Sequence, residues 1–158
     1  MIQRKQLLYA ILFFQSLLPL AAQEAVGPLP ADEPIRGWTL LSDNLAQGKS
    51  AIDRAKDYHI NHLQLSHDII HDLRHVRDGR RRGLAQELTD YAHKKGIREV
   101  VLWDRALYNL DYYPSVYRTA PGGKINLDNP AFWEWFKNDY RKMLDLVPGI
   151  QGLVLTFI

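Results

Sequence analysis

Gly152-Leu153-Val154-Leu155-Thr156-Phe157-Ile158 is the stretch of sequence that decides the fold. The run is almost entirely apolar and lacks an alternation of polar and apolar residues, as in a strand buried on both faces of a parallel sheet. No turn or polar tail follows the run before the last residue, Ile158. We therefore expect a buried parallel strand here, with the chain ending inside it.

Three earlier segments also have the composition of strands, and three segments with the apolar spacing of helices separate them. The expected strands are Ile35 to Leu41, Ile60 to Ser66 and Glu99 to Trp103. The expected helices are Ser50 to His59, Gly83 to Lys95 and Asn129 to Leu146. This alternation predicts an α/β fold with parallel (β/α) units joined by right-handed crossovers.

Residues at the helix ends suggest where the helices begin and stop. Ser50 is expected to cap the first helix, with Asp53 three residues later as in a capping box. Gly96 suits the position after the second helix, and Pro130 suits the first turn of the third. The run Gly48-Lys49-Ser50 resembles the end of a phosphate-binding loop, but the first glycine of that loop is missing. We therefore interpret this run as a helix start.

Two architectures fit this order of elements. A (β/α)8 barrel takes about 250 residues, and the four expected strands lie within residues 35–158, about half of that length. We therefore expect the first four strands of a (β/α)8 TIM barrel, truncated after the fourth. A flavodoxin-like open sheet is the alternative, and it would usually carry a glycine-rich phosphate loop, which the sequence lacks.

Composition restricts the possible functions. Hydrophobic residues make up 46% and charged residues 24% of the 158-residue chain, as in an ordinary globular domain. The formal charge of +2 comes from Arg4 and Lys5, because the rest of the chain has 18 basic and 18 acidic residues. This balance argues against a nucleic-acid partner. The sequence has no cysteine, which excludes disulfides, cysteine ligands and cysteine nucleophiles.

The N-terminus has the pattern of a secretory signal peptide. Met1 to Lys5 is positively charged, Leu7 to Leu20 is apolar, and small residues suit cleavage after Ala22. The apolar stretch is shorter than the roughly 20 residues of a membrane-spanning helix, so we favour cleavage over a retained anchor. We expect a signal peptide at 1–22, a proline-rich linker at 23–34 and the barrel half at 35–158, secreted or periplasmic and not bound to a membrane after cleavage.

In parallel α/β folds the functional site lies beyond the carboxyl ends of the strands. Polar and aromatic side chains follow the first three expected strands. The predicted substrate-binding residues are Asp43, Asn44, His67, Trp103, Asp104 and Arg105. We expect no cofactor at this site.

Two clusters of basic residues follow the second expected strand. His67, His71 and His75 would share one face if their segment were helical, a spacing that can hold zinc. The HExxH motif of metalloproteases is absent, so we expect no metal site. Arginines recur from Arg74 to Arg82, and we expect a solvated surface there, with recognition of a substrate carboxylate as the alternative.

The segment from Leu107 to Ile125 is long for a connection between a strand and a helix. It carries the tyrosines Tyr108, Tyr112, Tyr113 and Tyr117. Aromatic rings at this end of a sheet suit sugar binding, because the C–H faces of a pyranose stack on them. A loop that packs on its own tyrosines is the alternative.

Several segments resemble, in the same order, motifs of the α-glucuronidases of glycoside hydrolase family 67. Arg36 with Ser42-Asp43-Asn44 resembles a first barrel strand that ends in Trp-Asp-Asn, and Tyr58-His59-Ile60-Asn61 resembles the second strand with its Gly-Ile-Asn. Leu127-Asp128-Asn129-Pro130 resembles the entry to a helix with paired tryptophans, and Val147 to Val154 resembles the fourth strand. In this chain Ser42 replaces tryptophan and the aromatic loop is longer. That family carries a β-rich domain before its barrel, whereas we expect the barrel here to start almost directly after the signal peptide.

The resemblance implies a secreted (β/α)8-barrel glycoside hydrolase of which this chain holds the N-terminal half. In the resembled enzymes the general acid lies just after the fourth strand, and the base carboxylates come from later strands. The catalytic residues are therefore expected after Ile158.

We predict a fragment of a secreted glycoside hydrolase that acts on glycans, with polysaccharides substituted by uronic acids among the candidates. The parent would be an O-glycosyl hydrolase, and this chain would contact the carbohydrate without supplying the catalytic carboxylates. The alternative is a half-barrel product without activity, which either binds sugar or is unstable, because its first and fourth strands would be open edges.

Overall fold

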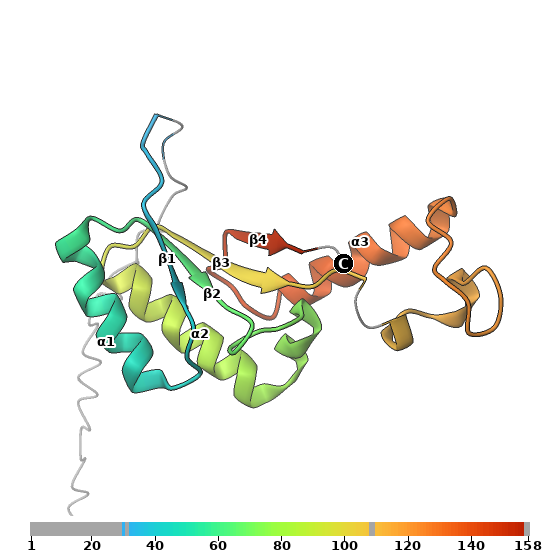
Figure 1. Cartoon of the computed structure of the whole chain (residues 1–158), viewed down its shortest axis with the longest axis horizontal. Helices are drawn as coiled ribbons and strands as arrows, with labels where there is room; N and C mark the ends of the chain where they lie inside the picture. Colours follow the sequence, from blue (N-terminus) through green and yellow to red (C-terminus); the bar gives the residue numbers. More distant parts are fainter. Residues whose placement is uncertain (1–29, 31, 108–109, 157–158) are drawn as a thin grey trace, which may run out of the picture.

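The computed structural model describes residues 30, 32–107 and 110–156. In this part of the chain four strands form one parallel sheet in the order β1-β2-β3-β4 (Figure 1). The strands are β1 Gly37–Leu40, β2 His62–Leu65, β3 Glu99–Asp104 and β4 Gly152–Leu155. The helices are α1 Leu45–Ala55, α2 Gly79–Lys94 and α3 Pro130–Leu144, with short 3-10 helices at Lys56–Tyr58 (η1), Leu73–Arg77 (η2), Leu110–Tyr112 (η3) and Ser115–Tyr117 (η4).

The predicted α/β class and the parallel sheet are confirmed. Three of the strands are shorter than expected, and β3 continues one residue further, to Asp104. The expected signal peptide at 1–22 and most of the linker at 23–34 lie outside the described residues. Among the described residues, no helix has the length and apolar character needed to cross a membrane.

One apolar cluster fills the space between the sheet and the three helices. The central strands contribute Leu63 and Leu102, which are fully buried. Ile52 of α1, Leu88 of α2 and Met143 of α3 belong to the same cluster. Because the three helices share one cluster, they pack on the same face of the sheet.

The other face of the sheet is more open. Side chains alternate between the two faces along a strand, so Thr39, Gln64 and Trp103 point away from the helices. Thr39 is exposed, and the other two are partly exposed. The face that carries Trp103 is therefore accessible near the ends of the strands.

A second cluster lies beyond the carboxyl ends of the strands. Tyr113, Ile125 and Phe132 are buried in it, and Trp135 and Phe136 pack against them. Figure 1 shows the segment between β3 and α3, together with the first half of α3, extending past the tips of the strands. The connection that is long in sequence is thus a folded extension with its own small core.

The first helix starts earlier than the sequence suggested. Asn44 caps α1 by accepting a hydrogen bond from the backbone N–H of Gln47, and the helix begins at Leu45. The predicted cap at Ser50 is therefore wrong. Asp53 does not complete a capping box, because its carboxylate pairs with Lys95 and accepts a hydrogen bond from the Tyr91 hydroxyl.

The second helix also starts earlier, because Asp78 caps it by accepting a hydrogen bond from the N–H of Arg81. Gly96 follows the helix with a φ of 89°, the left-handed conformation expected for a glycine there. Pro130 occupies the first turn of α3 after the cap residue Asn129, as predicted.

Gly48→Ala tests the close contact between α1 and α2. A Cβ atom at residue 48 would lie 2.7 Å from Cδ2 of Leu88, whose side chain is fully buried. Overpacking of this kind costs about 1–3 kcal/mol. We therefore expect urea denaturation to show a lower free energy of unfolding, despite the better helix propensity of alanine.

Gly83→Ala in α2 is the matched control, because nothing lies within 4 Å of a Cβ atom at residue 83. Alanine should raise the free energy of unfolding there by roughly 0.5–1 kcal/mol. Equal effects of the two substitutions would contradict the close packing at Gly48.

Candidate functional site

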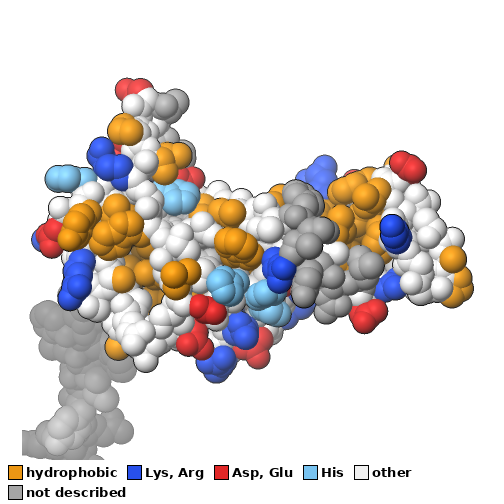
Figure 2. All heavy atoms as spheres, in the orientation of Figure 1, with side chains coloured by type: hydrophobic (Ala, Val, Ile, Leu, Met, Phe, Trp, Pro, Cys, Tyr) orange, Lys and Arg blue, Asp and Glu red, His pale blue; other side chains and the backbone are white. Residues whose placement is uncertain are grey.

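A hollow of about 260 Å³ lies at the carboxyl ends of β2, β3 and β4. Its lining residues are His67, His71, Trp103, Arg105 and Thr156. Figure 2 shows histidine side chains gathered near the centre of the visible face, with Lys or Arg side chains beside them. Three of the predicted substrate-binding residues, His67, Trp103 and Arg105, are thus brought together.

The strand ends place these side chains. Trp103 and Thr156 come from neighbouring parallel strands, and the N–H of Thr156 continues the pairing by donating to the carbonyl of Asp104 at 2.8 Å. His67 follows β2, where the N–H groups of Ile69 and Ile70 both donate to the carbonyl of Ser66 and turn the chain. Polar residues just after the strands therefore converge on one edge of the sheet.

Ring contacts and one hydrogen bond order the lining. The His67 ring lies 5.9 Å from the Trp103 ring and 6.2 Å from the His71 ring, between centroids. Nη1 of Arg105 lies 3.2 Å from Nε2 of His71. Because a guanidinium only donates, His71 accepts at Nε2 and its neutral form carries the proton on Nδ1.

Burial and neighbouring charges favour the neutral form of the His71 imidazole. Burial lowers the pKa of His71, and the neighbouring Arg105 and His67 lower it further. Burial also lowers the pKa of His75, followed by the charge of Arg81. The lining described here contains one guanidinium, two imidazoles, an indole and a hydroxyl, and no carboxylate. Such a site can bind a hydroxyl-rich or anionic molecule.

Asp104 lies under this site and does not line the hollow. Its side chain is fully buried, and its Oδ1 accepts a hydrogen bond from the N–H of Leu73 at 2.8 Å. Its Oδ2 accepts a hydrogen bond from the hydroxyl of Tyr140. Burial raises the pKa of the Asp104 carboxyl, against these two hydrogen bonds, which lower it. Both oxygens are thus engaged within the protein.

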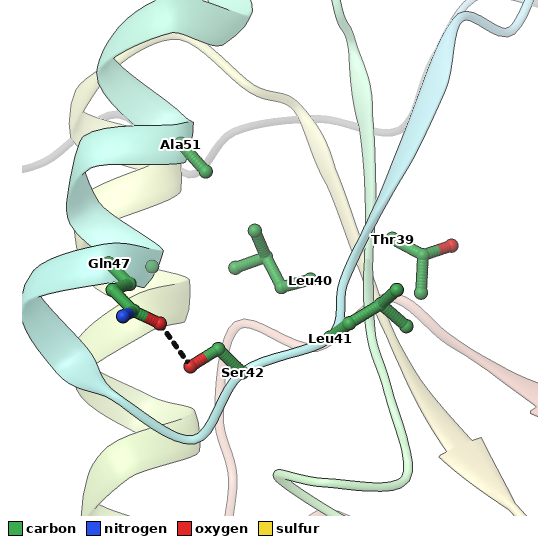
Figure 3. Close-up of a pocket in the computed structure, with 7 residues that line it drawn as sticks. Thr39, Leu40, Leu41, Ser42, Gln47 and Ala51 are labelled. Carbon is green, nitrogen blue, oxygen red and sulfur yellow. Dashed lines mark hydrogen bonds between the residues drawn. The ribbon is translucent and has the colours of Figure 1, made fainter.

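Asp43 and Asn44 also lie outside the lining of this hollow. Asn44 caps α1, and Asp43 is exposed with an oxygen 4.0 Å from Nη1 of Arg80. A second hollow, of about 320 Å³, lies beside β1 and the first turns of α1. It is mostly apolar, with Leu40 and Ala51 in its wall and a hydrogen bond between Ser42 and Gln47 at its edge (Figure 3).

The aromatic loop packs on itself, which was the alternative to a row of sugar-binding rings. Tyr113 is only 2% exposed, and its ring contacts Phe132, Trp135 and Phe136. The hydroxyl of Tyr112 donates to Asp139, and burial together with this bond raises the pKa of Tyr112 to about 12. Tyr108 lies outside the described residues.

The arginine cluster is only in part the solvated surface that the sequence suggested, because Arg74 is buried. Arg74 is buried, forms an ion pair with Asp72 and lies 4.3 Å from the centroid of the Tyr112 ring. Arg77 pairs with Asp139 at 2.7 Å. These residues join η2 to the aromatic extension, and Arg80 remains largely exposed.

The zinc hypothesis required a helix through His67, His71 and His75, and that helix is not formed. The segment turns after β2 and reaches a short 3-10 helix at Leu73–Arg77. In the described ranges, no group of three or more histidine or acidic side chains is arranged to hold a metal ion.

Thr156 and His71 line the hollow but were not among the predicted site residues. Thr156 is the first residue after β4, but the predicted strand continued to Ile158, so the rule on strand ends did not locate it. His71 reaches the site because of the turn after β2, for which the sequence offered no clear pattern.

Comparisons of the chain with protein-family models, with curated proteins and with solved structures found no match.

Asp104→Asn and Asp104→Ala separate the structural role of this carboxylate from its charge. Asparagine can still accept from Leu73 and donate to the oxygen of Tyr140, without a buried charge. We expect Asp104→Asn to keep or raise the free energy of unfolding at neutral pH. Asp104→Ala leaves the buried Leu73 N–H unpaired, which costs roughly 1–3 kcal/mol. Chemical denaturation measures both, and a larger loss in the asparagine variant would contradict the assigned hydrogen bonds.

Stability should fall in mild acid because of His71 and His75. Both have pKa values lowered from 6.5 in the folded protein, so below that pH the unfolded state binds more protons. We expect the free energy of unfolding to decrease as the pH falls below 6.5. The double variant His71→Gln, His75→Gln should show a flatter profile in urea denaturation. Identical profiles for the two proteins would refute the assignment.

Proposed function

We propose that this chain forms the first half of a (β/α)8 barrel in a secreted glycoside hydrolase, and that its hollow binds a sugar carrying an acidic group. The observation that carries the proposal is the lining of the hollow. An indole ring, a guanidinium and imidazoles gather at the carboxyl ends of parallel strands, where enzymes of this fold class bind their substrates.

Two features of the fold support the barrel. The strands follow the order of the sequence, and three helices pack on one face of the sheet. A barrel places its helices on the outside in this way. In the flavodoxin-like alternative the first strand lies between the second and third, and helices cover both faces, which differs from the order found in this chain.

The side chains suit an acidic sugar. The Trp103 ring offers an aromatic surface for the C–H face of a pyranose. Arg105 can bind a carboxylate through two parallel hydrogen bonds. His67 and Thr156 can exchange hydrogen bonds with hydroxyl groups. A uronic acid carries all three kinds of group, which agrees with the resemblance to α-glucuronidases.

The residues that line the hollow can bind a sugar, but they do not include the groups that catalyse hydrolysis. Cleavage of a glycosidic bond requires two carboxylates about 5–9.5 Å apart on either side of the bond. The lining residues include no carboxylate, and Asp104 is engaged with Leu73 and Tyr140. We therefore assign substrate binding to these residues and place the acid and base in later barrel strands. The same observation favours the second candidate, a sugar-binding domain without activity.

Calorimetric titration with acidic and neutral sugars tests the proposal. The ligands are a xylo-oligosaccharide substituted with glucuronic acid and the same oligosaccharide without it. We expect the acidic ligand to bind more tightly, and Arg105→Ala to weaken its binding at least about tenfold, or about 1.4 kcal/mol. Arg80→Ala is the control, because its side chain is 72% exposed. Equal affinity for the two ligands, or equal loss in the two variants, would refute an acidic-sugar site.

A further inference from the structure

Arg105 and His71, which line the hollow and are hydrogen-bonded to each other, lie on two different segments of the chain. Both segments form a hydrogen bond with Tyr113, which lies outside the hollow. Arg105 lies on the segment that leaves β3, and its hydrogen-bond partner His71 lies just before η2. Two residues after Arg105, the N–H of Leu107 donates to the hydroxyl of Tyr113 at 3.0 Å. Three residues after His71, Nη1 of Arg74 donates to the same hydroxyl at 2.7 Å.

We propose that the Tyr113 hydroxyl is a positioning group that holds Arg105 against His71, by accepting one hydrogen bond from each of the two segments that carry them. The proposal concerns the geometry of the site, and it rests on the proposed function only for the effect on sugar affinity. Tyr113 does not line the hollow, so it acts through Arg105 and His71.

The backbone at Leu107 shows that this segment needs to be held. Leu107 has a φ of 63°, in the left-handed region that a leucine adopts only at a cost. Its N–H bond to the Tyr113 hydroxyl fixes that conformation immediately after Arg105 and Ala106. The strained conformation therefore lies two residues after Arg105.

On the side of η2, the residues bonded to the Tyr113 hydroxyl are buried and held by further hydrogen bonds. Tyr113 is 2% exposed and Arg74 is 8% exposed. Arg74 is fixed by Asp72, which accepts from its guanidinium and, at 2.9 Å, from its backbone N–H. Asp72 directly follows His71 in the chain. The hydroxyl of Tyr113 thus joins the strained backbone at Leu107 to the buried ion pair of Arg74 and Asp72.

Tyr113→Phe removes the hydroxyl and keeps the ring in its aromatic cluster. NMR titration of the His71 ring provides a readout, because burial lowers the pKa of His71 and Arg105 lowers it further. The other titratable or charged groups that face the ring include His67, His75, Asp72 and Arg81. When Arg105 is released, the pKa of His71 should rise toward 6.5. Arg105→Ala gives the full size of this rise for comparison.

Tyr112→Phe is the matched control. It also deletes a half-buried phenol hydroxyl, which donates to Asp139 at 2.8 Å, and it keeps the ring over which Arg74 lies. It should lower the free energy of unfolding and leave the pKa of His71 unchanged. A general loosening of the aromatic extension would shift the pKa in both tyrosine variants.

Three results would overturn the proposal. These are an unchanged His71 pKa in Tyr113→Phe, equal shifts in the two tyrosine variants, and no rise in Arg105→Ala. Hydrogen exchange on the unsubstituted protein gives a test that does not depend on the variants folding. The Leu107 amide should be protected like a bonded amide, and exchange at the rate of an open loop would also overturn the proposal.

Sugar binding separates this proposal from the proposed function. If the hollow binds the acidic oligosaccharide, Tyr113→Phe should weaken binding severalfold, and Tyr112→Phe should not. If the unsubstituted protein binds no sugar, the proposed function fails, and the titration of His71 still decides the role of Tyr113.

Discussion

The buried carboxylate of Asp104 joins three parts of the chain that are far apart in sequence. It belongs to β3, accepts a hydrogen bond from Leu73 at the start of η2, and accepts another from Tyr140 in α3. A carboxylate is costly to bury unless its oxygens are bonded, so the fold tolerates Asp104 only with these partners in place. Because Trp103 and Arg105 flank it, the same bonds fix the end of β3 beneath the hollow.

The aromatic extension beyond the strands depends on charge as much as on apolar contact. Arg74 and Arg77 lie over the Tyr112 ring and are paired with Asp72 and Asp139. Ordering a long connection costs conformational entropy, and here ring packing, the buried Arg74–Asp72 pair and the more exposed Arg77–Asp139 pair offset it. The extension is therefore attached to η2, which follows the turn that carries His71.

The arrangement of the layers leaves a hollow open at the strand ends. With α1, α2 and α3 on one face of the sheet, side chains such as Trp103 on the other face stay accessible. Parallel strands also bring their first polar residues to one edge. These two constraints produce a hollow that His67 and Arg105 line together with Trp103, although the chain between His67 and Arg105 is long.

The sequence by itself determined the order of strands and helices, because apolar periodicity and helix-end residues are local properties. It also singled out His67, Trp103 and Arg105, which line one hollow in the structure, since each follows or ends a parallel strand. It did not decide whether Ser50 or Asn44 caps α1, because both residue types can cap a helix. In the structure Asn44 is the cap, and the first turn that follows it packs Gly48 against Leu88. Only the tertiary structure decided that Asp104 faces the helices while its neighbours Trp103 and Arg105 line the hollow. Side chains alternate along β3, and the Tyr140 hydroxyl of α3 supplies the hydrogen bond that Asp104 needs on the helix side.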